Sequence, residues 1–307
     1  MPRRPSLRQL EYLLAISEHR HFGEAAKKVA ASQPTLSLQL QALEDALGAR
    51  LVERNRNNIG LTPSGETVVE RAREILLQVD ELVAAVHRER ENLGGLIRLG
   101  TGPTVGPYIL PKIVPQLHAE YPTVRIYIRE ELPARLAKLV ADGSLDLALV
   151  ALPAHDDQLH AEEIGQEQLL IGLAHDHPLA RFKRIPPEYL AGEKFLTLGR
   201  GHRLYEEVDR LAARHGAEIL QDYEGTSLDA LRQMVALGMG LSVFPSYYAA
   251  SEIASDRSVV LRQLRGEILV RKLGFIWRPF AVRTADFTQL ATIAYHALKT
   301  VKPESGD

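Results

Sequence analysis

Apolar residues recur at helical spacing through the first fifty positions of the chain. They fall into three groups, Leu7–Leu14, Phe22–Val29 and Leu36–Leu47, with neighbours three or four residues apart. Short helices with short connections are typical of a helix-turn-helix. The third helix is expected to begin after Ser32, a favourable N-cap residue, and to end at Gly48.

The third predicted helix combines a row of leucines with a polar side. Gln33, Thr35 and Ser37 lie near its N-terminal end, where a recognition helix uses neutral hydrogen-bonding groups to read base edges. A polar side that merely faces solvent is the other interpretation. The next segment favours DNA binding, because Arg54 and Arg56 precede an Asn-Asn-Ile-Gly turn flanked by apolar runs, as in a wing. Arginines placed there suit phosphate contacts.

A single long helix is predicted after this wing. From Pro63 onward about 28 residues contain no helix breaker, which corresponds to roughly 42 Å of helix. Its apolar residues recur at three- and four-residue steps with charges between them. Such a helix cannot pack entirely on one small domain, so we expect it to pair with a second copy of the chain. Gly94 and Gly95 are expected to end it.

The rest of the chain alternates short apolar runs with helical segments. The runs are rich in valine, isoleucine and leucine, among them Leu96–Thr101, Leu145–Val150 and Leu269–Trp277. This alternation predicts parallel α/β sheets. Two sheets joined by crossovers near 164–167 and 266–269 leave a cleft between two subdomains, at the place where α/β proteins bind ligands.

Composition sets further limits. The 307 residues carry 37 Lys and Arg against 39 Asp and Glu, but residues 1–60 hold nine of the basic residues and six of the acidic ones, so the basic surplus lies at the front. There is no cysteine, which excludes disulfides, thiolate metal sites and thiol nucleophiles. No apolar run reaches membrane-spanning length and no signal peptide is evident, so we expect a cytoplasmic protein with several cores.

Enzymatic patterns are weak. The loop GTGPTVG after the first strand of this half lacks the third glycine of a dinucleotide fingerprint, because position 105 is Val105. The His-x-His pairs at 19–21 and 175–177 have no accompanying ligand set, and no serine stands in a nucleophile elbow. We expect no enzymatic activity, no cofactor and no metal. A solute-binding module or an enzyme is the alternative of a different class, and neither needs the first ninety residues.

The N-terminal part resembles the LysR-type transcriptional regulators. The likeness rests on about sixty unbroken residues, LRQLEYLLAISEHRHFGEAAKKVAASQPTLSLQLQALEDALGARLVERNRNNIGLTPSGE. The resemblance implies an α/β protein with a winged helix-turn-helix over 1–63, a linker and dimerisation helix over 64–92, and an effector domain shaped like a periplasmic binding protein over 93–307. It also implies promoter DNA as a partner and assembly as a homodimer, usually extended to a homotetramer.

Carried over by position, the family's contacts with DNA mark five residues of this chain: Gln33, Pro34, Thr35, Ser37 and Arg54. We add the neighbouring Arg56 because of its charge. One position departs from the family pattern. Leu38 stands where many members have arginine, and this removes one expected contact with DNA.

The effector half is most similar to the peroxide-sensing OxyR branch, through PTVGPYILPKIVPQLH, LAGEKFLTLGRGHRL, TSLDALRQMVALGMGLSVFP and GFIWRP. That branch uses a peroxidatic cysteine just after a Gly-His pair and a resolving cysteine later in the same segment. Here those positions hold Arg203 and Ala212, and neither side chain forms a sulfenic acid or a disulfide. The thiol switch is therefore absent. Subdomain I is expected over about 93–165 and 268–307, and subdomain II over about 166–267.

Two hypotheses describe the signal. In the first, a small anion such as a carboxylate binds in the cleft to a set of polar and charged residues: Thr104, His202, Arg203, Thr226 and Ser227. In the second, Arg203 pairs with Glu206 or Glu207 one turn further along its own helix. The protein is then a constitutive regulator or one with a different trigger.

Overall fold

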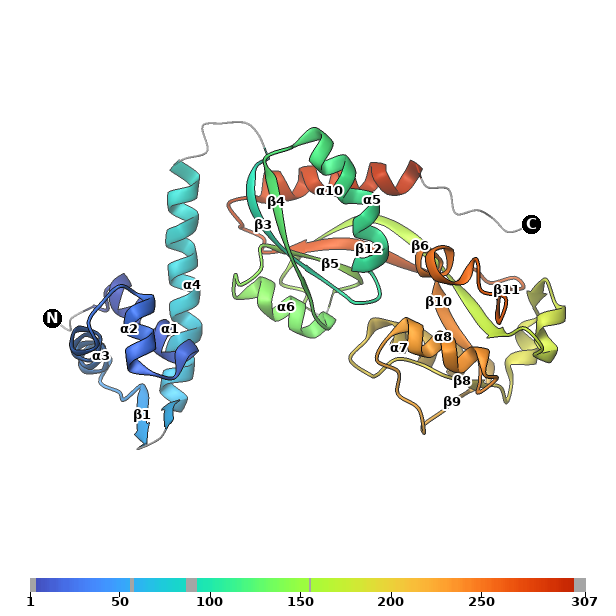
Figure 1. Ribbon diagram of the computed structural model, residues 1–307, viewed down its shortest axis with the longest axis horizontal. Coiled ribbons are helices and arrows are strands. Elements are labelled where there is room, and N and C mark those ends of the chain that lie inside the picture. The colour runs from blue at the N-terminus through green and yellow to red at the C-terminus, as the bar shows by residue number, and fades with distance from the viewer. Residues whose placement is uncertain (1–3, 56–57, 87–92, 155, 301–307) are drawn as a thin grey trace. The chain divides into compact units, whose positions relative to one another are not determined.

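The computed structural model describes residues 4–55, 58–86, 93–154 and 156–300 of the chain (Figure 1). It divides into two compact units, residues 1–91 and residues 92–307. Each unit has a hydrophobic core of its own. Within the described ranges, no helix is long and apolar enough to cross a membrane.

The N-terminal unit forms the predicted helices and wing. Its elements are α1 (Leu7–His19), α2 (Phe22–Lys28), α3 (Gln33–Leu47), β1 (Val52–Asn55), β2 (Asn58–Leu61) and α4 (Pro63–Val86). Ser32 caps α3 as predicted, because its hydroxyl accepts a hydrogen bond from the amide of Thr35 at 3.2 Å. Gly48 ends α3 in the left-handed conformation, with φ at 67°. The strands β1 and β2 pair antiparallel.

The leucine row of α3 forms the centre of this unit. Its buried members pack with residues of α1, α2 and the first turns of α4: Leu13, Ile16, Ala25, Leu36, Leu40, Leu43, Val69 and Ala72. Every one of these side chains lies on the apolar stripe that the helical spacing predicts. The opposite side of α3 is thereby left at the surface.

A buried carboxylate fastens the wing to α3. Glu44, only 5% exposed, accepts hydrogen bonds from the amides of Leu51 and Val52 at 2.7 and 3.3 Å, and its second oxygen lies 3.1 Å from Nη1 of Arg50. The two amides stand just before and at the start of β1. They would otherwise be buried without a partner, so Glu44 sets where the wing begins.

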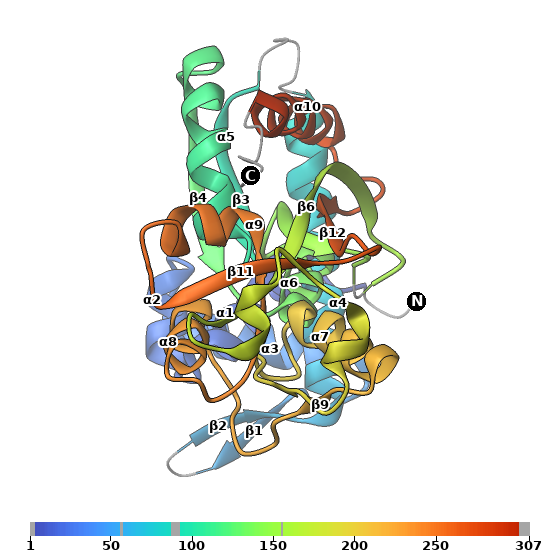
Figure 2. The ribbon, with the colours of Figure 1, turned by 90° about the vertical axis from the view of Figure 1, so that its right-hand side faces the viewer.

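The C-terminal unit is a mixed α/β structure. Its first part contains β3 (Gly95–Thr101), α5 (Gly106–Glu120), β4 (Val124–Glu130), α6 (Pro133–Ala141), β5 (Leu147–Leu152) and α10 (Thr284–Thr300). Helices α5 and α10 cover one face of the sheet and α6 covers the other (Figure 1 and Figure 2). The strand β5 is buried on both faces: Leu147 and Leu149 point to the α5 side, while Ala148 and Val150 point to the α6 side. This explains its continuous apolar run.

The second part is built around a separate apolar core. Its elements are β7 (Arg184–Ile185), β8 (Lys194–Phe195), α7 (Arg203–His215), β9 (Glu218–Ile219), α8 (Leu228–Ala236), β10 (Ser242–Pro245), α9 (Ser246–Tyr248) and β11 (Val259–Leu264), with short 3₁₀ helices at Pro178–Arg181 and Pro187–Leu190 and a π-helical segment at Ala249–Ile253. We call this part subdomain II and the first part subdomain I. The apolar run AEILQ (217–221) contributes only the two residues of β9.

Two strands pass between the subdomains, and they make the sheets mixed where the sequence predicted parallel ones. The strand β6 (His160–Ala174) pairs antiparallel with β12 (Val270–Trp277) as far as Gln168, and with β10 from Leu169 onward. Strand β12 also runs antiparallel to β5, whereas β3 is parallel to both β4 and β5. An alternation of strands and helices predicts parallel strands, because each helix carries the chain back to the starting edge of the sheet. Strand β12 returns from subdomain II without such a helix, and it pairs antiparallel with β5 and β6.

Replacing Glu44 tests how the wing is held. Glu44→Ala leaves the amides of Leu51 and Val52 without their acceptor, and we expect the N-terminal unit to lose about 1–3 kcal/mol of stability. Hydrogen exchange of these two amides in the full chain measures the loss. The control is Glu24→Ala on α2, which removes only an exposed pair with Lys27 and should leave exchange unchanged. Equal exchange in both variants would show that Glu44 does not anchor the wing.

Candidate functional site

The exposed side of α3 is the candidate DNA interface. Gln33, Pro34 and Thr35 are exposed in its first turn and Ser37 is half-buried. The hydroxyl oxygens of Ser32 and Thr35 are 2.7 Å apart, so the N-cap that starts the helix also orients Thr35. Leu38 is 66% exposed on the same helix. The surface therefore offers neutral hydrogen-bonding groups beside one apolar side chain, a combination suited to base edges and thymine methyl groups.

One of the two arginines assigned to this interface lies in the first strand of the wing. Arg54 belongs to β1, opposite Ile59 of β2, which places it next to the hairpin turn. Arg56 lies outside the described residues. Basic residues in this position flank the helix that precedes them, and phosphate contacts from a wing fix the register of that helix on a duplex.

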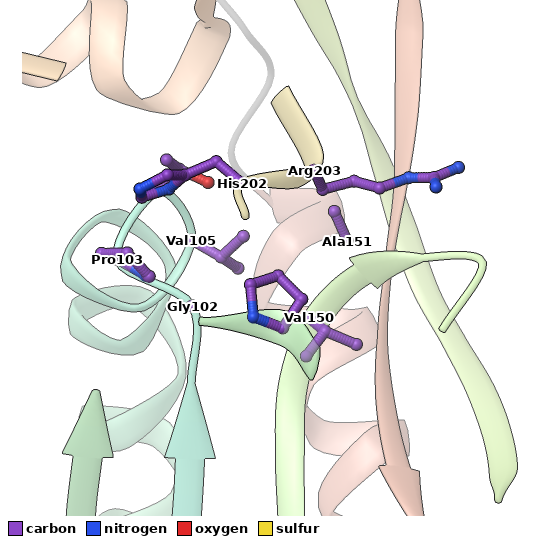
Figure 3. A pocket seen from close by; sticks show the side chains of 9 residues that line it. Gly102, Pro103, Val105, Val150, Ala151, His202 and Arg203 are labelled. Carbon is purple, nitrogen blue, oxygen red and sulfur yellow. The ribbon is translucent and has the colours of Figure 1, made fainter. Parts of the chain in front are cut away.

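A small pocket marks the predicted cleft. It lies between the loop that follows β3 and the start of α7 (Figure 3), and its volume is about 10 Å³. Nine residues line it: Gly102, Pro103, Thr104, Val105, Pro133, Val150, Ala151, His202 and Arg203. This volume holds roughly one water molecule, so the cleft is closed in this conformation. Thr104, His202 and Arg203, three of the five residues assigned to the effector site, line this pocket together.

The remaining two residues assigned to the effector site are placed elsewhere. Ser227 is the N-cap of α8, and its hydroxyl accepts a hydrogen bond from the amide of Ala230 at 3.2 Å. Thr226 is exposed immediately before it. Neither residue is part of the pocket lining. The hydroxyl of Ser227 has a structural role that the helix-start pattern alone explains.

Three backbone N–H groups of the loop after β3 are used within the fold. The carbonyl of Gly102 accepts hydrogen bonds from the amides of Val105 and Gly106 at 3.0 and 2.9 Å, and the amide of Gly102 donates to the carbonyl of Leu149 at 3.3 Å. This tight turn starts α5. Three donors of the loop are thus occupied within the fold, and the loop is not a ready anion nest.

Arg203 pairs within its own helix. Its Nη1 contacts the carboxylate of Glu206, and its Nε lies 4.0 Å from an oxygen of Glu207, which also binds Arg210. The side chain is 14% exposed and is directed away from His202 (Figure 3). Its Nε is buried without a hydrogen-bond partner. A cation at the N-terminal end of a helix is unfavourable for the helix dipole, and the two carboxylates one turn on offset that cost.

His202 is the N-cap residue of α7, and its side chain makes no capping hydrogen bond. Burial lowers the pKa of its imidazole below the usual value, and Glu224 only partly opposes this effect. The neutral form is therefore favoured at neutral pH. A neutral imidazole offers a ligand one donor and one acceptor rather than a positive charge.

The sequence-based assignment missed a buried ion pair that contacts the cleft loop. Arg271 of β12 and Glu167 of β6 face each other across the antiparallel pair, both nearly inaccessible to solvent. Nη1 of Arg271 donates to the hydroxyl of Thr104 at 3.1 Å, and Nη2 donates to its carbonyl at 2.7 Å. The sequence does not single out this pair, because Glu162 and Glu163 of β6 and Lys272 of β12 are charged as well.

Family models match both units of the chain. Residues 7–66 match the bacterial regulatory helix-turn-helix protein of the lysR family, and residues 90–298 match the LysR substrate binding domain. Among curated proteins, the chain is 36% identical over 286 residues to the DNA-binding transcriptional dual regulator OxyR of Escherichia coli K12, covering 93% of each chain. It is 35% identical to the hydrogen peroxide-inducible genes activator of Haemophilus influenzae, covering 96% of this chain and 98% of that protein.

Solved structures show the same likeness. A cysteine-to-aspartate variant of full-length OxyR from Pseudomonas aeruginosa superposes with a TM-score of 0.79 at 29% identity, covering 95% of each chain. A cysteine-to-serine variant of Corynebacterium glutamicum OxyR with hydrogen peroxide bound gives a TM-score of 0.66 at 29% identity, covering 98% of this chain and 94% of that one. Both proteins carry a substituted cysteine, whereas this chain contains no cysteine at all.

The lowered pKa of His202 predicts an acid-sensitive contribution to stability. The unfolded chain binds a proton at His202 at higher pH than the folded chain does, so stability falls as the pH drops below about 6.5 towards the folded pKa. We expect His202→Gln to remove this loss, so that the stability of the variant relative to the wild type rises as the pH falls from about 7.5 to about 5. Thermal unfolding midpoints at the two pH values measure it, with His118→Gln as the control for losing one imidazole. A constant difference between His202→Gln and wild type would contradict the proposed burial effect.

Proposed function

The chain belongs to the LysR family of DNA-binding transcriptional regulators, and from this premise we propose that it binds promoter DNA through α3 and senses its signal in the cleft beside α7. The observation that carries the DNA-binding role is the exposed polar first turn of α3 above a fully buried leucine row. The domain limits that we propose are those expected from the sequence: 1–63, 64–92 and 93–307.

The proposed DNA contacts combine two kinds of side chain. Gln33, Thr35 and Ser37 supply hydrogen bonds to base edges, and Pro34 packs between them at the helix start. Arg54 and Arg56 of the wing neutralise phosphates, which gives salt-dependent affinity without sequence information. We propose that α4 pairs two copies of the chain, so that two recognition helices read two half-sites, and that dimers assemble further into a tetramer.

Exchanging single residues on α3 tests this interface. Gln33→Ala should weaken binding to the duplex that the wild type selects from a random pool by about 1–3 kcal/mol, because one base contact is lost. Leu38→Arg should strengthen binding to all duplexes and steepen the dependence of log Kd on log salt by roughly one, because a phosphate contact is added. Gel-shift titrations at several salt concentrations measure both. Gln116→Ala on α5 is the matched control. If the α3 variants bind DNA with the same Kd and salt dependence as this control, α3 is not part of the interface.

The signal that we propose for the cleft is a small anion, such as a carboxylate, rather than peroxide acting on a thiol. Arg203 supports this proposal, since it is a cationic residue of the pocket lining and its buried Nε lacks a hydrogen-bond partner. An anion there would replace Glu206 as the partner of Arg203, with His202 and Thr104 on the other side of the pocket. The closed cavity of about 10 Å³ means that binding also requires the loop and α7 to separate.

A second candidate is favoured by a specific observation. Arg203 is already paired with Glu206 and Glu207, so its charge is neutralised without any ligand. In this alternative the cleft has no anion to bind, and the protein regulates constitutively or through another trigger. The two candidates differ in one respect only, namely whether an external anion competes successfully with the two glutamates.

Thermal shifts of the full chain with a panel of small carboxylates distinguish them. A ligand at 100 times its Kd stabilises the folded state by about 2.7 kcal/mol, which raises the unfolding midpoint by several degrees. Glu206→Gln should increase the shift because it removes the competing carboxylate, and Arg203→Gln should abolish it. The control is Arg214→Gln, which loses a pair with Glu267 and leaves both partners of Arg203 in place. If no carboxylate shifts either the wild type or Glu206→Gln, the constitutive candidate holds.

A further inference from the structure

The ion pair between Arg271 and Glu167 is unusually well enclosed. Both side chains are 1% exposed, and Nε of Arg271 donates to Glu167 at 2.7 Å. The same guanidinium donates through its two remaining nitrogens to the hydroxyl and the carbonyl of Thr104. All three nitrogens of the fork therefore have partners. A buried charge is tolerated when the geometry is this complete, and removing one partner leaves an uncompensated charge in the interior.

The pair stands at the point where the chain crosses between the subdomains. Along β6, Glu167 is the last residue but one that pairs with β12, and pairing with β10 begins two residues later at Leu169. On the other crossing segment, Leu269 accepts a hydrogen bond from the amide of Leu169 at 2.8 Å, two residues before Arg271. The charges of Arg271 and Glu167 thus join the two crossing segments to each other. We call this crossing, at 167–169 and 269–271, the hinge.

The contacts of the pair extend into both subdomains. The free oxygen of Glu167 accepts a hydrogen bond at 3.3 Å from the amide of Tyr247, in α9 of subdomain II. Thr104 belongs to the loop between β3 and α5 of subdomain I, which lines the cleft. The ring of Tyr247 lies 5.4 Å from Nζ of Lys112 on α5. Cleft loop, crossing strands and α9 therefore share one set of polar contacts.

We propose that Arg271 is a positioning residue that couples the cleft loop to the hinge, so that the loop cannot open unless the crossing strands also change their arrangement. Thr104 is held by its carbonyl and its hydroxyl to a group that belongs to the hinge rather than to the loop. A movement of this loop breaks two hydrogen bonds to a buried cation, whose one other hydrogen-bonding partner among the described residues is Glu167. The coupling goes beyond the proposed signal and does not depend on which ligand, if any, the cleft takes.

Spin labels in the full chain provide the test, because the chain has no cysteine of its own. Labels at Ala119→Cys on α5 and Ala213→Cys on α7, both exposed alanines, report the distance between the subdomains. In this background we expect Arg271→Met to broaden the distance distribution. In the same variant, the amides of Gly106 and Tyr247 should exchange with solvent about tenfold faster or more. Arg271 then no longer holds the loop that contains the acceptor of Gly106, or the carboxylate of Glu167 that accepts from Tyr247.

The matched control is Arg283→Met. Arg283 also binds a carboxylate and two backbone carbonyls, those of Asp286, Leu96 and Gly94, but away from the hinge. The Arg283→Met substitution should lower the unfolding midpoint without changing the distance distribution between the two labels. If Arg271→Met does not fold, Arg271→Lys replaces it, because an ammonium keeps the charge but cannot reach Glu167 and both Thr104 oxygens together. An unchanged distance distribution, or a change in the loop without one at the hinge, overturns the proposal.

Discussion

The C-terminal unit depends on a pair of opposite charges enclosed where two strands cross from one subdomain to the other. Arg271 and Glu167 are opposite each other in the ladder, so the register of β6 against β12 and the position of the charges determine one another. A shift by one residue would place Arg271 opposite Gln166 or Gln168 and separate the two charges. Apolar cores on either side fix the subdomains separately, but the polar contacts of this pair fix how the segment between them is arranged.

Local patterns were sufficient to predict the N-terminal unit. The spacing of Leu36, Leu40 and Leu43 defines the buried stripe of α3, and the polar residues between them are left at the surface by the same geometry. Ser32 and Gly48 mark the helix ends because their roles depend only on neighbouring backbone groups. The role of Glu44 was not predicted, since its partners in the wing are reached through a turn whose shape no periodicity encodes.

The cleft was predicted less completely than the helices. Its position followed from the order of strands, and Thr104, His202 and Arg203 do meet there. Strand direction and the partner of Thr104 did not follow, because both are decided by contacts between segments far apart in the sequence. The pairing of Arg203 with Glu206 and Glu207 is local, and it was one of the two hypotheses. Thr104 was expected to face a ligand, but Arg271, 167 residues later in the chain, holds both of its oxygens. Isolated hydroxyls in a loop cannot reveal a partner at that separation.

The row of charges along α7 has a consequence for how a response would end. Arg203, Glu206, Glu207 and Arg210 form successive ion pairs in the segment where the OxyR branch would carry its two cysteines. A covalent bond between sulfurs persists until a reductant cleaves it. Ion pairs on a helix separate and re-form with the motion of their own side chains, within nanoseconds. Under the proposed function, the response ends when the anion leaves the cleft, because no covalent bond has to be reduced.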